Sequence, residues 1–464
     1  MDLFGTAGIR GPVRDRVTPE RALSVGHALG RYIRSVERKA PAVVVGWDGR
    51  ETSHSLAAAV EAGLTSAGVD VRRVGELPTP ALAYCSQDRY GVMITASHNP
   101  PTDNGIKLFD DGEEFDSSAE GEIERLLADT DEPTAWNEFG TSGRADELGT
   151  YRDRIIEYAV TTLGGAHDEP LSGVSVVVDC GNGVSSVATP QVLRALGAHV
   201  VTLNANVDGT FPGRESKPTP ETLTDLRAFL RDGEFDLGIG HDGDGDRIVI
   251  VGPDGDVVHE DTILAVLARQ YVAESDSDDP VVITTPNASA RIDQALREAG
   301  GRTERVRLGA LHEGIARERR QGETDTEVVF AAEPWKHIHP AFGGWIDGVV
   351  SAAAVAVLVA DAGDTATLRE PITERPYRKV SVDCPDDAKA DVMATLETDL
   401  PERFPDATVD TEYGIRLTFP DASWLLVRPS GTEPYVRLYA ESDDVDELVA
   451  SARSIVDDVV SERR

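Results

Sequence analysis

One pattern occurs three times along this sequence: a run rich in β-branched residues stops at a loop of Gly, Asn or Asp, and a segment with helical periodicity follows. These runs lie at 42–50, 174–184 and 280–290. Each unit then has a second apolar run that leads directly into a polar loop, at 91–100, 235–247 and 326–337. Alternating strands and helices predict parallel sheets, and ligands bind at the carboxyl ends of such strands. The repeat therefore predicts three similar α/β domains that direct three polar loops towards one site.

The C-terminal part of the chain follows a different pattern. Short apolar runs separated by turns occupy 377–441, and a segment with helical periodicity follows at 445–460. This order predicts a smaller α+β domain. With breaks near 150, 252 and 370, the predicted domains are 1–150, 151–252, 253–370 and 371–464.

The charge balance restricts the partners. The chain has 82 acidic and 45 basic residues, a net charge of −37. A surface this acidic repels nucleic acids and anionic membranes, so we expect a small-molecule partner and neither of those. The few lysines are Lys39, Lys107, Lys217, Lys336, Lys379 and Lys389. An acidic surface with little lysine is typical of proteins from salt-loving archaea, and it predicts a halophilic origin.

The three cysteines, Cys85, Cys180 and Cys384, form neither a CxxC pair nor an even set. They are expected to be reduced thiols in the core. The first residues lack a basic segment followed by an apolar one, and the longest apolar run, 349–360, is too short to cross a bilayer. We therefore expect a cytoplasmic protein.

Three aspartates alternate with glycine directly after an apolar run: Asp242, Asp244 and Asp246. Glycine allows the three carboxylates to converge on one cation, and hard oxygen ligands favour Mg²⁺ over zinc. An EF-hand would need Gly and Glu where Arg247 and Pro253 stand, so calcium sensing is excluded. We expect one Mg²⁺ per chain, against the alternative of an ordinary acidic turn.

A second polar turn lies in the C-terminal domain. Its hydroxyls, backbone N–H groups and flanking guanidinium groups suit a phosphate dianion; the residues are Arg428, Ser430, Gly431, Thr432 and Arg437. The alternative is a plain hairpin turn. The N-terminal segment 4–13, with Arg10, resembles a weaker anion contact, and 208–221 is either a further contact or only a linking loop.

Ser97 stands beside His98 in "TASHNP". A hydrolytic triad is unsuitable, because adjacent residues of an extended segment point in opposite directions and the chain has no G-x-S-x-G elbow. Near a metal and arginines that bind phosphate, Ser97 is better interpreted as a carrier of a phosphoryl group.

Together these segments resemble the α-D-phosphohexomutase family of phosphoglucomutases, phosphomannomutases and phosphoglucosamine mutases. "TASHNP" is similar to its phosphoserine loop, "DGDGDR" to its magnesium loop and "RPSGTEP" to its phosphate-binding loop. The predicted fold is α/β: three similar α/β domains with mixed, largely parallel sheets and a smaller C-terminal α+β domain, around a central cleft.

The resemblance also implies a mechanism. Ser97 would carry the phosphoryl group and share the Mg²⁺ with the three aspartates, and a sugar bisphosphate would be intermediate and activator. The surrounding catalytic residues would be Arg10, His98, Lys107 and Arg247. Lys107 is the candidate acid–base group, on the expectation that neighbouring cations lower its pKa; the alternative is a plain phosphate partner.

One loop departs from the family pattern G-E-x-S-G-H, because this chain reads "AEPWKHI" at 332–338. The candidate sugar-binding residues are Glu333, Trp335, Lys336 and His337. Trp335 would stack on a sugar face and Lys336 would contact phosphate or a ring oxygen; alternatively Trp335 packs between domains and Lys336 is solvated. The expected function is a phosphosugar mutase acting between the 1- and 6-positions of glucose or mannose phosphate. The alternatives are a phosphoglucosamine mutase or phosphopentomutase, a metal-dependent sugar phosphatase, or a non-catalytic sugar-phosphate binding protein.

Overall fold

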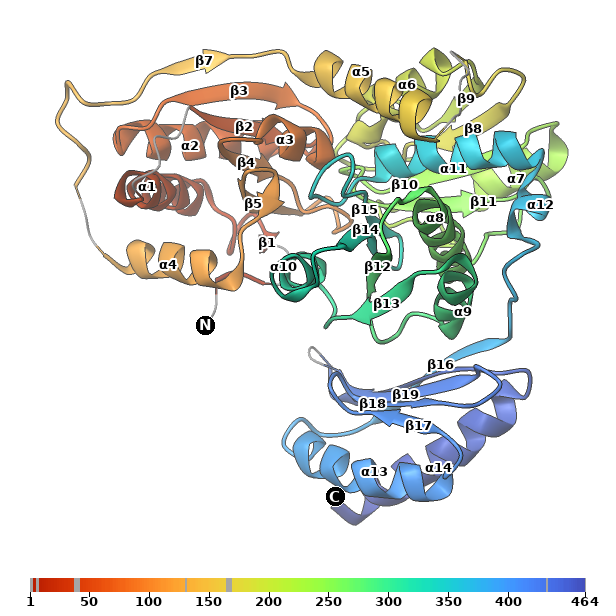
Figure 1. Ribbon diagram of the computed structural model, residues 1–464. Helices are drawn as coiled ribbons and strands as arrows, with labels where there is room; N and C mark the ends of the chain where they lie inside the picture. Colours follow the sequence, from red (N-terminus) through yellow and green to blue (C-terminus); the bar gives the residue numbers. More distant parts are fainter. Residues whose placement is uncertain are drawn as a thin grey trace. The chain divides into compact units, whose positions relative to one another are not determined.

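The computed structural model of the chain describes residues 3–5, 8–36, 42–129, 132–163, 169–430 and 433–463. They form two compact units (Figure 1): Met1–Glu260 with Trp335–Leu368, and Asp261–Pro334 with Arg369–Arg464. Each unit contains two sheets or parts of them. The sequence from 253 to 370, predicted as one domain, is thus divided between the two units.

The first sheet of the first unit is parallel at one side and antiparallel at the other. Its strands, in spatial order, are β1 (Ile9–Pro12), β5 (Asp103–Asp110), β4 (Tyr90–Ile94), β2 (Val43–Trp47), β3 (Val71–Glu76) and β7 (Ser142–Arg144), with β6 (Glu113–Glu114) beside β5. Strands β4, β2, β3 and β7 run parallel, whereas β5 runs antiparallel to β1, β4 and β6. The helices of this region are α1 (Pro19–Ser35), α2 (Ser53–Ser66), α3 (Thr79–Cys85) and α4 (Ser117–Ala128).

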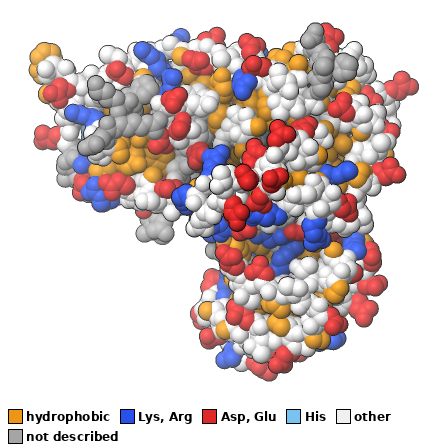
Figure 2. All heavy atoms as spheres, viewed as in Figure 1, with side chains coloured by type: hydrophobic (Ala, Val, Ile, Leu, Met, Phe, Trp, Pro, Cys, Tyr) orange, Lys and Arg blue, Asp and Glu red, His pale blue; other side chains and the backbone are white. Residues whose placement is uncertain are grey.

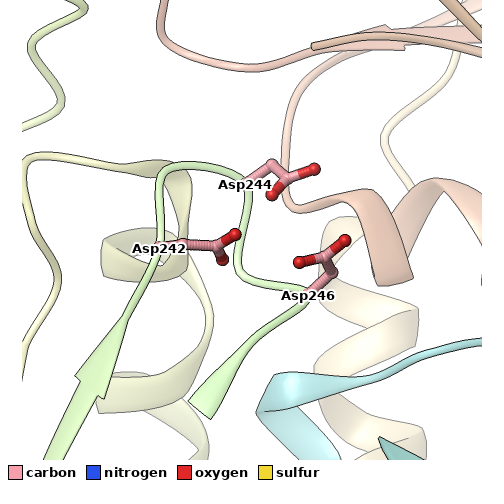
Figure 3. Close-up of side chains that lie close together, drawn as sticks. All are labelled: Asp242, Asp244 and Asp246. Atoms are coloured by element: carbon pink, nitrogen blue, oxygen red, sulfur yellow. The ribbon is translucent and has the colours of Figure 1, made fainter. Parts of the chain in front are cut away.

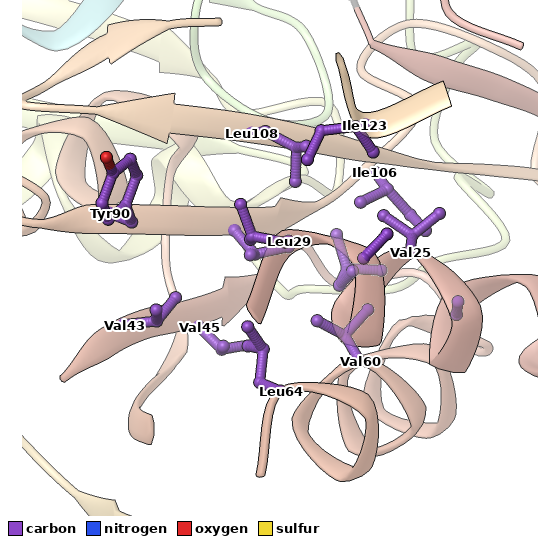
Figure 4. Close-up of a cluster of buried hydrophobic side chains, with 14 of the residues drawn as sticks. Val25, Leu29, Val43, Val45, Val60, Leu64, Tyr90, Ile106, Leu108 and Ile123 are labelled. Carbon is purple, nitrogen blue, oxygen red and sulfur yellow. The ribbon is translucent and has the colours of Figure 1, made fainter. Parts of the chain in front are cut away.

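Helices α1 and α2 cross at a contact that only glycine allows. A Cβ atom at Gly26 would lie 2.2 Å from the carbonyl oxygen of Val60, and one at Gly63 would lie 2.1 Å from that of Leu23. Next to this close crossing lies a hydrophobic core, in which aliphatic side chains of both helices pack against those of the strands (Figure 4). This core fixes the carboxyl ends of β2 and β4, where the polar loops begin.

The second sheet of the first unit repeats the design on a smaller scale. Its strands, in order, are β11 (Ile248–Val251), β10 (Leu237–His241), β8 (Ser175–Asp179) and β9 (His199–Leu203). Only the β10–β11 pair is antiparallel. The helical segments nearby are α5 (Leu148–Tyr158), η1 (Ala159–Leu163), η2 (Val184–Val187), α6 (Thr189–Ala195) and α7 (Thr224–Asp232).

Two later elements, β15 (Lys336–Ile338) and α11 (Gly348–Ala362), also belong to the first unit. Helix α11 is buried on every side from Gly348 to Val359, a stretch that has no charged residue, as expected of an interior helix. It contacts α6, β10 and β11. Asp347 caps its start by accepting hydrogen bonds from the backbone N–H groups of Val349 (3.0 Å) and Val350 (2.9 Å).

The second unit begins within α8 (Glu260–Glu274) and resumes within α12 (Thr365–Arg369). Its parallel strands are ordered β13 (Arg302–Arg305), β12 (Asp279–Thr284) and β14 (Thr326–Glu333), with α9 (Ala290–Ala299) and α10 (Leu311–Gln321) packed on them.

The C-terminal sheet is antiparallel throughout. Its order is β16 (Tyr377–Asp383), β20 (Tyr435–Glu441), β19 (Trp424–Pro429), β18 (Ile415–Thr418) and β17 (Thr408–Asp410). Helices α13 (Lys389–Arg403) and α14 (Val445–Arg463) cover one face of it (Figure 1).

These sheets confirm the predicted α/β class with mixed, largely parallel sheets and a final α+β domain. The three cysteines are buried free thiols, as expected. Acidic side chains are spread over the face seen in Figure 2. Within the described residues, no helix has the length and hydropathy needed to cross a membrane.

Candidate active site

Asp242, Asp244 and Asp246 lie in the turn between β10 and β11, and their side chains converge (Figure 3). All three are buried, and each offers a carboxylate oxygen within 4.8 Å of the others. The turn needs Gly245, whose φ of +72° is in the left-handed region. His241 stabilises the turn, because its Nδ1 lies 2.7 Å from the carbonyl oxygen of Arg247. Burial lowers the pKa of His241 to about 4, so the ring is neutral.

The triad has the electrostatics of a cation site. Asp244 Oδ1 and Asp246 Oδ1 are buried without a hydrogen-bond partner among the described residues. Burial, together with the charges of Asp246 and Asp244, raises the pKa of Asp242 well above its usual value. Unshared carboxylate oxygens in a buried cluster fit a hard divalent cation such as Mg²⁺, which the three aspartates would hold.

Ser97 lies at this triad. It follows β4 in the loop to β5, its side chain is fully buried, and its hydroxyl donates a 2.8 Å hydrogen bond to Asp242 Oδ2. Its backbone has a φ of +51°, an unusual value for a serine. The two loops that the sequence singled out are therefore in direct contact.

Basic side chains surround the serine and the triad. Lys107 Nζ on β5 lies 3.4 Å from Asp246 and 3.1 Å from Glu114. Arg247 Nε lies 3.7 Å from Asp242 and 3.8 Å from Asp246. Arg10, on β1, has two guanidinium nitrogens, Nε and Nη2, buried without a hydrogen-bond partner in the described part of the chain. Such donors suit an incoming phosphate group.

The expected lowering of the pKa of Lys107 is wrong. Burial does lower it, but the carboxylates of Glu114, Asp246 and Asp244 outweigh burial and raise the pKa above its usual value. The Lys107 ammonium group therefore keeps its proton and is suited to donate hydrogen bonds to a phosphate or to another oxygen acceptor. Asp246 shows the reciprocal effect: burial opposes its ionisation, but Lys107 and Lys336 lower its pKa below the usual range.

His98 does not activate Ser97. Its Nδ1 lies 3.4 Å from the Ser97 hydroxyl, beyond a good hydrogen bond. Burial, with Arg247 and Arg10, lowers the pKa of His98 to about 3. The ring is thus neutral and weakly basic, in agreement with the rejection of a hydrolytic triad.

Two side chains that sequence reasoning missed support the site. Thr79, at the start of α3, donates a 2.7 Å hydrogen bond from Oγ1 to Asp244 Oδ2. Ser216 accepts from the N–H of Gly243 and donates to the carbonyl oxygen of Ser97, both at 3.1 Å. Ser216 lies in the 208–221 segment, for which the sequence predicts either an anion contact or a linking loop. Hydroxyl residues are too common for either to stand out in the sequence alone.

The atypical segment lies beside the metal turn. The N–H of Ile248 donates to the carbonyl oxygen of Trp335 (3.2 Å), and the half-buried indole packs against the apolar cluster that contains Val177 and Val249. Lys336 is half-buried and acts electrostatically on Asp246 and His98. His337 is buried, with Nδ1 3.1 Å from Ser351 Oγ. The packing of Trp335 agrees with the packing alternative, and its contact with a sugar face stays a prediction.

The other predicted binding residues belong to the second unit. Glu333 ends β14 and accepts a hydrogen bond from the N–H of Gly309 at 3.1 Å. Arg428 and Arg437 stand opposite one another on β19 and β20, and the Nε of each is buried without a hydrogen-bond partner among the described residues. Two neighbouring arginines of this kind suit an anion, and their phosphate-binding role stays a prediction.

Ser430, beside these arginines, is buried, and Lys389 donates to its carbonyl oxygen (2.7 Å). Sequence reasoning missed this lysine. Gly431 and Thr432 lie outside the described residues.

Comparisons with known proteins agree with this geometry. The chain matches four domain families: "Phosphoglucomutase/phosphomannomutase, alpha/beta/alpha domain I" over 1–134, domain II over 151–255, domain III over 259–376 and the C-terminal domain over 380–458. It is 38% identical to the phosphopentomutase of Thermococcus kodakarensis, covering 100% of this chain and 99% of that protein. It is 40% identical to the "Probable phosphoglucosamine mutase" of Methanopyrus kandleri, covering 98% of this chain and 99% of that protein.

A solved structure of a phosphoglucomutase/phosphomannomutase family protein from Burkholderia thailandensis has a TM-score of 0.85 and 25% identity, covering 100% of this chain and 97% of that one. The N-acetylphosphoglucosamine mutase of Aspergillus fumigatus, solved with GlcNAc-6P and magnesium, has a TM-score of 0.60 at 15% identity, over 99% and 96% of the two chains, and shares the fold. By its domains, its relatives and its fold, this chain belongs to the phosphoglucomutase/phosphomannomutase family of phosphomutases, a class of isomerase.

Proposed function

We propose that the chain is a phosphosugar mutase that moves a phosphoryl group between the 1-position and the terminal carbon of a sugar phosphate through Ser97. The observation that carries the proposal is the 2.8 Å hydrogen bond from the Ser97 hydroxyl to Asp242, a member of the buried triad. It gives the nucleophile and the cation site one common location.

The reaction would have two balanced halves. In the first, the bond between Ser97 Oγ and phosphorus breaks, a sugar hydroxyl oxygen bonds to that phosphorus, and the proton of that hydroxyl passes to Oγ, so that Ser97 becomes a free hydroxyl. The sugar bisphosphate turns over, and its other phosphoryl group returns to Ser97. When bound by the triad, Mg²⁺ would neutralise charge on the phosphoryl oxygens. Arg10 and Lys107 would bind the phosphate while it is transferred, and Arg428 and Arg437 would bind the phosphate at rest.

For the sugar, sequence reasoning put glucose or mannose first, with glucosamine and pentose phosphates as alternatives. The relatives with 33–40% identity favour the alternatives, because they are named for phosphoglucosamine or phosphopentose. We therefore rank glucosamine phosphate first, pentose phosphate second, and glucose and mannose phosphates third.

A coupled assay tests both parts of the proposal. The purified protein, with Mg²⁺ and a catalytic amount of sugar bisphosphate, is offered glucosamine, glucose, mannose and pentose 1-phosphates at low and high salt. Isomerised product supports a mutase, and the order of kcat/KM identifies the sugar. Release of inorganic phosphate without isomerised product would indicate a phosphatase. Binding measured by calorimetry without turnover would indicate a non-catalytic protein.

A further inference from the structure

The loop that carries Ser97 is held by one buried guanidinium. Arg50, just beyond β2, donates from Nη2 to the carbonyl oxygens of Ser97 (2.8 Å) and Asn99 (2.7 Å). From Nη1 it donates to those of Pro100 (2.7 Å) and Asp103 (2.9 Å). A single buried side chain therefore binds four carbonyl oxygens of the segment 97–103, which comprises most of the β4–β5 loop and the first residue of β5.

The partner of Arg50 holds the other side of Ser97. Asp48 Oδ2 accepts from Arg50 Nε (3.0 Å) and from the hydroxyl of Thr95 (2.7 Å). That hydroxyl in turn accepts from the N–H of Ser97 (2.9 Å). The Asp48–Arg50 ion pair thus restrains both the N–H and the C=O of Ser97.

This restraint supports an unusual backbone conformation of Ser97. Ser97 has a φ of +51°, a value that an L-residue other than glycine rarely adopts without support. The ring of Phe211 covers the Arg50 guanidinium, with Cζ 5.0 Å from the ring centre, and Ser216 binds the Ser97 carbonyl oxygen from the same segment. The segment 208–221 therefore packs against both the ion pair and the Ser97 loop.

We propose that Asp48 and Arg50 are positioning residues that hold Ser97 in its left-handed conformation, so that the phosphoryl group on Oγ is transferred to a sugar hydroxyl and not to water. The inference rests on the proposed function. In the competing reaction, the bond between Oγ and phosphorus breaks, a water oxygen bonds to the phosphorus, and Oγ takes up the proton that the water loses. The products are free Ser97 and inorganic phosphate.

The physical reason is the different freedom of the two acceptors. A bound sugar hydroxyl has a fixed position, so in-line transfer to it fails when Oγ changes direction. Water is mobile and can approach a displaced phosphoryl group from many directions. Loosening Ser97 should therefore slow transfer to sugar much more than transfer to water.

The test compares wild type with Arg50→Lys and Asp48→Asn. Lysine keeps the charge at position 50 but lacks the planar set of donors that reaches four carbonyl groups. We expect kcat for mutase turnover to fall by about 30- to 100-fold and KM to change by less than about threefold. The inorganic phosphate released per mutase turnover should rise by at least about tenfold. Mass spectrometry of intact protein, loaded with sugar bisphosphate and then freed of it, should show that the rate of phosphate loss to water falls much less than kcat.

Arg291→Lys is the matched control, because Arg291 is also buried and binds Thr262, Ser289 and Glu441 in the second unit. It should lose stability without a change in phosphate release per turnover. If Arg50→Lys does not fold, Thr95→Val breaks the same connection at the N–H of Ser97 with little change in volume. Wild-type kcat and phosphate release in the folded variants would overturn this inference alone. A wild-type protein without mutase activity would overturn the proposed function as well.

Discussion

The hydroxyl of Ser97 and the carboxylate of Asp242 share a 2.8 Å hydrogen bond that joins loops 145 residues apart in the chain. Ser97 supplies the proton of this bond, so a phosphoryl group on Oγ removes the donor and brings negative charge to a buried carboxylate. That charge is tolerable only with cations close by, and Lys107 and Arg247 supply some of them.

Replacing Ser97 by alanine should abolish turnover. Without Oγ no phosphoryl group can be carried, and we expect mutase activity to fall by at least about 10³-fold with circular dichroism unchanged. Mass spectrometry of intact protein should show a phosphate adduct on wild type and none on Ser97→Ala. Ser86→Ala is the control, since Ser86 is equally buried but its hydroxyl donates to the carbonyl oxygen of Ala83 in α3, away from the triad. Full activity in Ser97→Ala would exclude the serine mechanism.

Phosphorylation and metal binding should strengthen one another. A dianion beside the Asp242, Asp244 and Asp246 cluster adds a ligand and charge for Mg²⁺, and linkage requires the converse effect to be of equal size. We expect phosphorylated protein to bind Mg²⁺ at least about fivefold more tightly than dephosphorylated protein. Isothermal titration of the two forms measures the difference. Equal affinities would separate the cation site from the serine.

The Thr79 hydroxyl should tune the metal affinity without touching the substrate. Its 2.7 Å hydrogen bond orients Asp244 Oδ2, and loss of such a support commonly lowers metal affinity by about 10–100-fold. In Thr79→Val, the Mg²⁺ concentration for half-maximal activity should rise, while kcat at saturating Mg²⁺ should stay near wild type. Thr284→Val is a matched control, because Thr284 is buried in β12 and bonds to the carbonyl oxygen of Ala332. An unchanged Mg²⁺ requirement in Thr79→Val would assign Thr79 to packing alone.

The parts of the site that the sequence predicts are those formed by residues close together in the chain. Glycine between Asp242, Asp244 and Asp246 indicates converging carboxylates whatever surrounds them, and the strand repeat places Ser97 at a strand end. The repeat also predicts the parallel strand pairs of the first three sheets. It does not reveal that β5 and β11 run antiparallel, because an apolar strand after a short turn reads the same in either direction.

The parts that sequence reasoning missed depend on contacts between distant residues of common types. Thr79 meets Asp244 across 165 positions, and Ser216 meets Ser97 across 119. The predicted direction of the Lys107 pKa shift is wrong for the same reason, because strand β6 brings Glu114 close to the Lys107 ammonium group. A local pattern reveals residue types and their spacing, whereas these contacts depend on how distant segments pair and pack in the folded chain.

The roles of Trp335 and Lys336 can be separated by two substitutions. Trp335 has a φ of +66° and packs on apolar residues, so Trp335→Gly relieves backbone strain but loses packing. We expect a net loss of about 1–2 kcal/mol in the free energy of unfolding, with the ranking of sugars unchanged. Lys336→Gly removes a cation that acts on Asp246, and it should lower kcat/KM with a smaller effect on stability. Denaturant unfolding and the four-sugar assay measure both. A changed ranking in Trp335→Gly would support the predicted stacking of Trp335 on the sugar.

Asp347 should make the stability of the first unit depend on pH. Its carboxylate is buried at the start of α11 and accepts hydrogen bonds from the Tyr151 hydroxyl (2.9 and 3.0 Å) and from Trp345 Nε1 (3.1 Å). Burial outweighs these bonds and raises the pKa from 3.8 to about 6. The folded chain therefore keeps this proton to a higher pH than the unfolded chain.

Between pH 4 and 6 the folded state binds more protons at Asp347, so its stability falls as pH rises through this interval and is level above it. A shift of about two pKa units corresponds to about 3 kcal/mol. Asp347→Asn cannot titrate, so its free energy of unfolding should lack this part of the decline. The difference between wild type and variant, measured by denaturant unfolding at pH 4, 5, 6 and 7, isolates Asp347 from the other carboxylates. A constant difference over this range would show that the buried group has an ordinary pKa and that its hydrogen bonds compensate fully for burial.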